Sequence, residues 1–171
     1  DRVYTSPTEF LERVPEQPCG CLVSDFRMRG LSGLDLLRHV NTKQINLPVI
    51  MLSAHGEVPD VVEAIQGGAI NFLQRPYRSQ ALIDSVHAAI EVWKTQEQER
   101  AYYLELKARH EALTTRERET LDGVVAGNAN KVIAADLGIA EKTVEERRAR
   151  VMTKMGAQSA AELVRITVEL R

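Results

Sequence analysis

Short apolar runs alternate with amphipathic segments up to about residue 92. The runs CLVS (21–24), PVIMLS (48–53) and INFLQ (70–74) are rich in Val, Ile, Leu or Phe, which is typical of strands buried on both faces of a parallel sheet. Between them, apolar residues recur at helical spacing in SPTEFLERV, GLDLLRHV and VPDVVEAIQGG. This alternation predicts an α/β domain with a parallel sheet over residues 1–92.

Residues that favour helix ends support the same assignment. Ser6 is suited to an N-cap, Pro7 to the first helical position, and Glu9 to the N3 position of a capping box. The segment GLDLLRHV follows Ser32, and the glycine pair at 67–68 suits a helix C-terminus. Each predicted helix therefore has a local signal for at least one of its ends.

A long helical pattern runs from about residue 79 to 112. Leu82, Val86, Ile90 and Trp93 recur at spacings of three and four, a polar stretch follows over 94–100, and an apolar texture then returns. We predict a linker helix over residues 93–113. It is either a solvated connection or a short coiled-coil or dimer contact, and the few heptads present leave both alternatives open.

From residue 114 onward the strand patterns stop. A short helix, a tight turn at 138–140 and a longer basic helix have the spacing of a helix-turn-helix. Capping boxes are expected at Thr114/Glu117 and Ser159/Glu162. Residues 114–171 are therefore predicted to form a four-helix domain from the segments LTTRERETLDGVVAG, NKVIAADLG, IAEKTVEERRARVMTKMG and SAAELVRITVELR.

The charge distribution restricts any nucleic-acid site to one helix. The formal net charge is -2, so the chain as a whole has no basic footprint. Residues 114–171 carry ten Lys and Arg against nine Asp and Glu, and the basic bias lies in the third of the four helices. That helix either contacts phosphates or is a solvated charged helix of a small bundle. Its basic residues are Lys142, Arg147, Arg148, Arg150 and Lys154.

The sequence shows neither a membrane-spanning pattern nor a secretory signal. No apolar run approaches the roughly 18 residues of a membrane helix, and no signal peptide heads the chain, so we expect a cytoplasmic protein. Cys19 and Cys21 would share one face of a strand, which favours core packing over metal binding. Because the chain starts at Asp1 without a methionine, we expect sequence upstream of it.

Two sets of motifs resemble known families. SDFRMRGLSG, PVIMLSAHGEV and GAINFLQRPY have the order and spacing of the receiver domain of response regulators. LTTRERE, NKVIAADLGIAEKTV and KMGAQSAAELV resemble the LuxR-type DNA-binding domain. Together they resemble two-component response regulators of the FixJ/NarL class. The resemblance implies a flavodoxin-like doubly wound receiver, a long linker helix, and a four-helix LuxR-type helix-turn-helix domain.

The resemblance also implies a phosphorylation site. Asp25 matches the phospho-acceptor, which takes a phosphoryl group from a sensor histidine kinase and contributes one ligand to Mg²⁺. Ser53 matches the hydroxyl that binds the phosphoryl oxygens, and Phe72 the aromatic whose rotamer changes on activation. Arg75 stands where the family has a lysine, before a cis bond to Pro76. No enzyme activity is expected from this site.

Departures from the receiver pattern keep a second hypothesis open. The chain opens at RVYTS, which resembles strand two, so the first strand and its acidic pair have no counterpart. We favour missing upstream sequence as the explanation over a rearranged sheet or a sheet completed by another chain. Mg²⁺ is expected only if the acidic pair exists in that upstream sequence. Arg75 replaces a lysine and Arg29 a proline, which places extra guanidinium groups near Asp25. The alternative is a phosphorylation-independent transcription regulator whose receiver serves as a dimerisation or protein-interaction module.

For DNA, the resemblance implies base-edge contacts from around Glu145, Glu146 and Ala149. Adjacent glutamates repel phosphates unless one accepts from a cytosine amino group, so we expect weak or dimer-dependent binding to promoter DNA. A homodimer suits two half-sites about one helical turn apart. The candidate DNA-binding residues are Lys131, Lys142, Thr143, Glu145, Glu146, Arg148, Ala149, Arg150 and Lys154.

Overall fold

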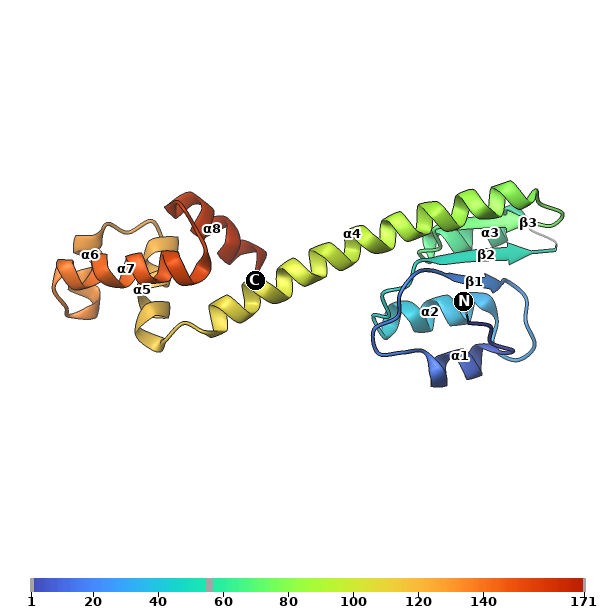
Figure 1. The fold of residues 1–171 in the computed structure, drawn as a ribbon, viewed down its shortest axis with the longest axis horizontal. Helices are drawn as coiled ribbons and strands as arrows, with labels where there is room; N and C mark the ends of the chain where they lie inside the picture. The colour runs from blue at the N-terminus through green and yellow to red at the C-terminus, as the bar shows by residue number, and fades with distance from the viewer. Residues whose placement is uncertain (1, 55–56, 171) are drawn as a thin grey trace. The chain divides into compact units, whose positions relative to one another are not determined.

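The chain divides into two compact units. The computed structural model describes residues 2–54 and 57–170. Contacts within the chain separate an N-terminal unit, Asp1–Gln98, from a C-terminal unit, Glu99–Arg171. The helix α4, Ser79–Glu111, is continuous and contributes residues to both units (Figure 1).

The N-terminal unit is built on a parallel sheet of three strands. The strands are β1 (Leu22–Asp25), β2 (Val49–Ser53) and β3 (Asn71–Gln74), in the order β1-β2-β3. The helices α1 (Pro7–Arg13), α2 (Gly33–Thr42) and α3 (Val58–Gln66) connect or precede them. The carboxyl ends of parallel strands meet at one edge of a sheet, and this edge therefore gathers the segments that follow all three strands.

Alternate side chains of β2 enter two different apolar clusters. Val49 and Met51 pack with α1, α2 and α3, in the cluster that contains Leu37. Ile50 and Leu52 pack against α4 through Ala89. Figure 1 shows α1 and α2 on one side of the sheet and α4 on the other. Burial of both faces confirms the predicted α/β domain with a parallel sheet.

Helix ends in the N-terminal unit follow the local signals, with one change. Ser6 caps α1 by accepting from the backbone N–H of Glu9, and Pro7 occupies the first turn. The Glu9 carboxylate, however, accepts from the backbone N–H of Thr5 at 2.8 Å, one residue before the expected donor. A complete capping box forms instead at α2, where Ser32 and Asp35 satisfy each other's backbone N–H groups.

Two expectations for the N-terminal unit are wrong. The segment RVYTS (2–6), which resembles a strand, forms none, and the sheet of the described residues consists of β1, β2 and β3. Cys19 is exposed, whereas Cys21 is half-buried against the α4 side of the sheet. Gly20 lies between them with a φ of 111°, so the backbone is not extended there and strand alternation does not apply.

The C-terminal unit is helical and contains the predicted helix-turn-helix. Its helices are α5 (Thr115–Val125), α6 (Asn130–Leu137), α7 (Glu141–Met155) and α8 (Ala160–Glu169). Gly138 ends α6 in the left-handed conformation, with a φ of 63°, which allows the tight turn into α7. Leu106 from the end of α4 is buried in the same core as Leu121 of α5 and Val144 of α7.

The two predicted capping boxes of the C-terminal unit differ. Thr114 and Glu117 form a complete box at the start of α5. At α8, Ser159 accepts from the N–H of Glu162, but the Glu162 carboxylate accepts from the N–H of Gln158. This is the same displacement by one residue that Glu9 shows at α1.

None of the helices in the described part of the chain combines the length and apolar character that crossing a membrane requires.

Candidate functional site

A small open pocket lies at the carboxyl edge of the sheet. It has a volume of about 90 Å³, well below the few hundred Å³ of a typical small-molecule site, and so suits a group of a few heavy atoms. The ends of β1 and β2 and the segment after β3 supply its walls. The residues that line it are Asp25, Arg27, Leu52, Ser53, Ala54 and Arg75.

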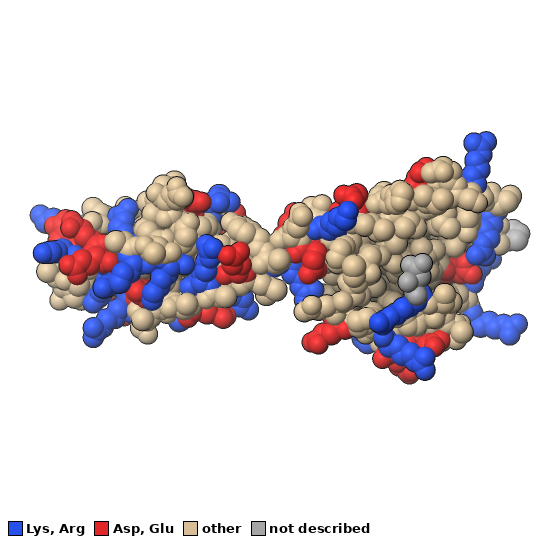
Figure 2. Space-filling view, in the orientation of Figure 1, with Lys and Arg blue, Asp and Glu red and all other residues tan. Residues whose placement is uncertain are grey.

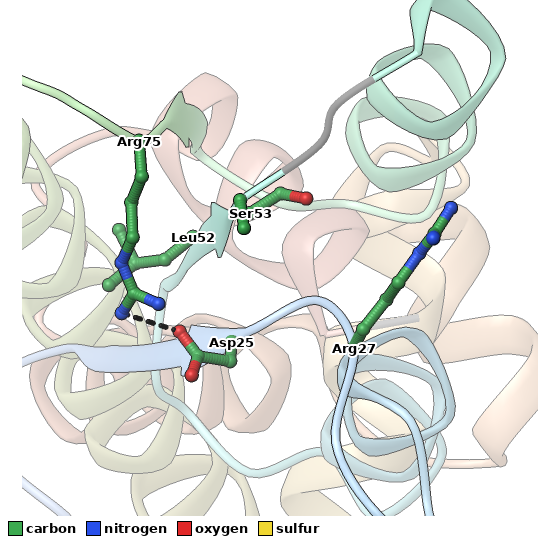
Figure 3. A pocket seen from close by; sticks show the side chains of 6 residues that line it. Asp25, Arg27, Leu52, Ser53 and Arg75 are labelled. Carbon is green, nitrogen blue, oxygen red and sulfur yellow. Dashed lines mark hydrogen bonds and ion pairs between the residues drawn. The ribbon is translucent and has the colours of Figure 1, made fainter.

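An ion pair joins two sides of this pocket. The Arg75 guanidinium donates from Nη2 to Oδ1 of Asp25 at 2.9 Å. Figure 3 shows the two side chains pointing toward each other, Asp25 from the end of β1 and Arg75 from the segment after β3. Both side chains are nearly half exposed, so solvent screens the pair and a ligand can reach it.

Backbone contacts hold the three segments of the pocket together. Asp25 lies opposite Leu52 in the register, and the N–H of Phe26 donates to the carbonyl of Leu52 at 2.6 Å. The N–H of Arg75 donates to the carbonyl of Ser53 at 2.7 Å. The Ser53 side chain is buried at the end of β2, and the Arg75–Pro76 bond is cis, as the resemblance implies.

Gly33 lets α2 begin directly against the end of β1. Its N–H donates to the carbonyl of Phe26 at 2.9 Å. A Cβ at this position would collide with the carbonyl oxygen of Asp25 and lie 3.0 Å from the Cα of Phe26. A glycine is therefore required here by close backbone approach, and this approach fixes the position of Asp25.

Phe72, on β3, does not line the pocket. Its ring meets the ring of Phe26 edge-on, with centroids 5.7 Å apart and planes at 68°. Phe26 directly follows Asp25, so this ring pair connects the end of β1 to β3. Phe72 is half-buried in the cluster on the α1 and α2 side of the sheet.

The arginines that follow Asp25 are placed differently from each other. Arg27 lines the pocket, but its guanidinium pairs with Asp60 in the first turn of α3, with 3.4 Å between Nη2 and Oδ2. Arg29 is exposed and does not line the pocket. Figure 3 shows the Arg27 side chain pointing away from Asp25.

The residues of this pocket do not by themselves fit a magnesium site. Mg²⁺ prefers several oxygen ligands in octahedral geometry. Asp25 is the one carboxylate in the pocket lining, and Arg75 donates to one of its oxygens. Among residues 2–54 and 57–170, no group of three or more His, Cys, Asp and Glu side chains is placed to hold a metal ion.

One face of α7 carries most of the candidate DNA-binding residues. Positions 142, 145, 146, 149 and 150 are exposed and recur at spacings of three and four, while Val144, Val151 and Met155 are buried in the core. Thr143 is half-buried, and Lys131 is exposed on α6. In the view of Figure 2, basic and acidic side chains intermingle over both units, consistent with a basic bias that is only local.

Two candidate DNA-binding residues are held by partners within the C-terminal unit. Arg148 is half-buried and donates to Oδ1 of Asn130, at the start of α6, at 3.0 Å. Lys154 pairs with the buried Glu117 of α5, with 2.7 Å between Nζ and Oε2. Hydrogen bonds from Lys154 and Thr114 hold the pKa of Glu117 at about 2, below its ordinary value of 4.5.

Three of these side-chain pairs join residues that lie far apart in the sequence. Arg27 and Asp60 are 33 positions apart, Arg148 and Asn130 are 18 apart, and Lys154 and Glu117 are 37 apart. Helical periodicity and capping patterns report on neighbours within about four residues. No local signal therefore predicts these contacts, although each depends on elements that were themselves predicted.

Comparisons with known proteins match both units. Residues 2–87 match the response regulator receiver domain, and residues 111–167 match the bacterial regulatory proteins of the luxR family. The transcriptional regulatory protein FixJ of Bradyrhizobium diazoefficiens is 39% identical over 166 residues, which cover 97% of this chain and 81% of that protein. The response regulator protein TmoT of Ectopseudomonas mendocina is 38% identical, with 99% of this chain and 77% of that protein covered.

Solved structures show the same likeness. The response regulator StyR matches with a TM-score of 0.83 and 35% identity over 97% of this chain and 84% of its own. Full-length FixJ from B. japonicum matches with a TM-score of 0.54 and 37% identity over 99% of this chain and 83% of its own. With its parallel sheet, long helix and helix-turn-helix, the chain belongs to the FixJ-like DNA-binding response regulators, which carry a receiver domain followed by a LuxR-type domain.

Proposed function

We propose that Asp25 accepts a phosphoryl group from a sensor histidine kinase and that this modification controls DNA binding by the C-terminal unit. The observation that carries the proposal is the pocket itself, which brings together a reachable carboxylate, a buried hydroxyl residue and a guanidinium. These are the groups that attack a phosphoryl donor and then stabilise the transferred phosphoryl group. The family membership of the chain supports the same role.

In the proposed transfer, a carboxylate oxygen of Asp25 bonds to the phosphorus of a phosphohistidine on the kinase. The phosphorus–nitrogen bond breaks, and its electron pair returns to the imidazole, which is protonated as it leaves. Arg75 is within reach to donate to the phosphoryl oxygens, and we assign Ser53 the same task from the end of β2. Phe72 would report the change through its ring contact with Phe26.

For DNA, we propose that the exposed face of α7 enters the major groove. Glu145, Glu146 and Ala149 would face base edges, and Lys142 with the half-buried Thr143 would approach phosphates from the first turn. Lys131 and Arg150 are exposed and available for further phosphate contacts. Arg148 and Lys154 would reach DNA only by leaving Asn130 and Glu117, and we therefore assign them mainly to holding α7 in place.

The test is labelling with acetyl phosphate and MgCl₂, measured by intact mass. We expect wild type to gain one phosphoryl group and Asp25→Asn to gain none. Asp84→Asn removes an exposed carboxylate on α4 of the same unit and should label like wild type. A duplex selected from a random library then reports DNA affinity before and after labelling, and the proposal expects a gain in wild type only.

A second candidate function rests on the Asp25–Arg75 ion pair. A guanidinium that already neutralises the carboxylate at 2.9 Å can hold the receiver in one state without modification. The chain would then be a phosphorylation-independent transcription regulator, with its receiver acting in dimerisation or protein interaction. Absence of labelling in wild type, together with binding to the selected duplex, would favour this function over the first.

A further inference from the structure

Arg27 occupies a position between the pocket and the first turn of α3. It follows Asp25 by two residues and lines the same pocket. Its guanidinium does not join the Asp25–Arg75 pair but reaches Asp60, with 3.4 Å between Nη2 and Oδ2. In Figure 3 the Arg27 side chain extends away from Asp25.

The Arg27–Asp60 pair is weak enough to be exchanged for a better partner. The Arg27 side chain is 69% exposed, and its 3.4 Å contact is longer than the 2.9 Å contact of Arg75 with Asp25. Exposed pairs of this kind contribute little because solvent screens them and two side chains must be ordered. A phosphoryl group on Asp25 would add a charge of about -1.5 to -2 and three strong acceptor oxygens, a much stronger target for a guanidinium.

The helix that Arg27 holds is loosely attached. Of the described residues of α3, only Ala64 is fully buried, while Val58, Val62 and Ile65 are exposed. Its N-cap residue, Glu57, makes no side-chain hydrogen bond to the helix. Besides the Asp60 contact, a second exposed ion pair connects α3 to α2 through Arg38 and Glu63. Few buried contacts make the first turn of α3 sensitive to the loss of one ion pair.

We propose that Arg27 senses the phosphoryl group: it pairs with Asp60 while Asp25 is unmodified and transfers to the phosphoryl oxygens once Asp25 is phosphorylated. The transfer leaves Asp60 without this partner and loosens the first turn of α3. This inference rests on the proposed function of Asp25 and adds a specific regulatory contact to it. It assigns to Arg27 a positioning role, since the residue acts on α3 through Asp60.

Thermodynamic linkage gives the inference a measurable consequence. If phosphorylation breaks the Arg27–Asp60 ion pair, then the ion pair opposes phosphorylation by a factor set by its own free energy. Removal of Asp60 must favour phosphorylation by that factor. For an exposed ion pair this factor is roughly 1.5- to 5-fold. At a limiting acetyl phosphate concentration, Asp60→Asn is therefore expected to raise the ratio of phosphorylated to unphosphorylated protein by this factor. Arg27→Gln is expected to lower the same ratio.

The experiment compares wild type with Arg27→Gln, Asp60→Asn and the double variant. Arg29→Gln removes the same charge from the same loop at a residue that does not line the pocket. Arg38→Gln breaks the other ion pair of α3. Amide hydrogen exchange of a peptide from α3 is measured before and after labelling. The side chains of Arg27, Arg29 and Arg38 are exposed and that of Asp60 is half-buried, so the fold should persist.

The expected result has three parts. Asp60→Asn labels more than wild type, the double variant labels no more than Arg27→Gln, and both control variants label like wild type. In wild type, labelling speeds exchange at the start of α3 by roughly the same factor, whereas in Asp60→Asn this exchange is already fast and changes little.

The failures of the two proposals are distinguishable. If wild type labels at Asp25 and Asp60→Asn labels to the same extent, Arg27 does not sense the phosphoryl group, although the proposed function of Asp25 stands. Equal effects of Arg27→Gln and Arg29→Gln would also overturn the inference, because charge alone would then explain them. If no protein labels, both proposals fail together.

Discussion

The buried Glu117 of the C-terminal unit makes a strong prediction about stability. The residue is 5% exposed, and its Oε2 accepts from three groups: the backbone N–H of Thr114 at 2.8 Å, the Thr114 hydroxyl at 2.9 Å, and Nζ of Lys154 at 2.7 Å. These contacts connect the start of α5 to the last turn of α7. The perturbation is Glu117→Gln, which keeps the shape and an acceptor oxygen but removes the charge.

The pKa of Glu117 sets the sign and the size of the effect. Because the folded pKa is about 2, below the ordinary 4.5, the charged form stabilises the fold fully above about pH 4.5. This stabilisation is lost as the pH falls through 4.5 toward 2. The shift corresponds to at most about 3 kcal/mol. Lys154 is 38% exposed, and solvent screening reduces the expected loss in Glu117→Gln to about 1–2 kcal/mol at pH 7.

Urea unfolding at several pH values measures this loss. Circular dichroism follows the helices of both units, whereas fluorescence of Trp93, the one tryptophan in the sequence, follows the N-terminal unit. The exposed Glu119→Gln is the matched control and should unfold like wild type. We expect the curves of wild type and Glu117→Gln to approach each other as the pH falls toward 2, where Glu117 is half protonated in the folded protein and fully protonated in the unfolded one. A gap at pH 2 as large as that at pH 7, or no gap at pH 7, would refute the assignment.

Three further predictions concern other parts of the chain. Gly33→Ala should destabilise the N-terminal unit by about 1–3 kcal/mol, since the new Cβ collides with the backbone of Asp25; urea unfolding followed by Trp93 fluorescence measures this. Leu121→Ala should destabilise the C-terminal unit by about 2–5 kcal/mol, because Leu121 is 1% exposed in its core, with the Trp93 transition unchanged. Lys142→Gln should weaken binding to every duplex to a similar extent and reduce the slope of log affinity against log salt by about one, measured by fluorescence anisotropy over a salt series.

Local patterns in the sequence predict the elements of this fold well. The strands lie within one residue of the runs CLVS, PVIMLS and INFLQ. The fit is explained best for β2, which is buried along its whole length and must therefore be apolar, whereas β1 and β3 are only partly buried. The turn between α6 and α7 was predictable because Gly138 tolerates the left-handed conformation it requires. The capping boxes were only partly predictable: Ser6 and Ser159 cap their helices, but the paired glutamates accept from the residue before the cap.

The side-chain geometry of the candidate site was only partly predictable. The motifs indicated that Asp25, Ser53 and Arg75 meet, since Asp25 and Ser53 end β1 and β2 and Arg75 directly follows β3 at the same edge of the sheet. They did not indicate that Arg27 reaches Asp60 while Arg29 lies outside the pocket, because the orientation of a long side chain depends on what a distant element presents to it. Such pairing is a property of the assembled tertiary structure.

The alternating burial of β2 couples the packing of the two apolar clusters to the position of Ser53 in the pocket. Val49 and Met51 belong to one core, and Ile50 and Leu52 to the other, so a slip of β2 by one residue would exchange all four between environments. The same slip would carry Ser53 out of the pocket. Selection for a stable core therefore also preserves the alignment of Asp25, Ser53 and Arg75 at the edge of the sheet.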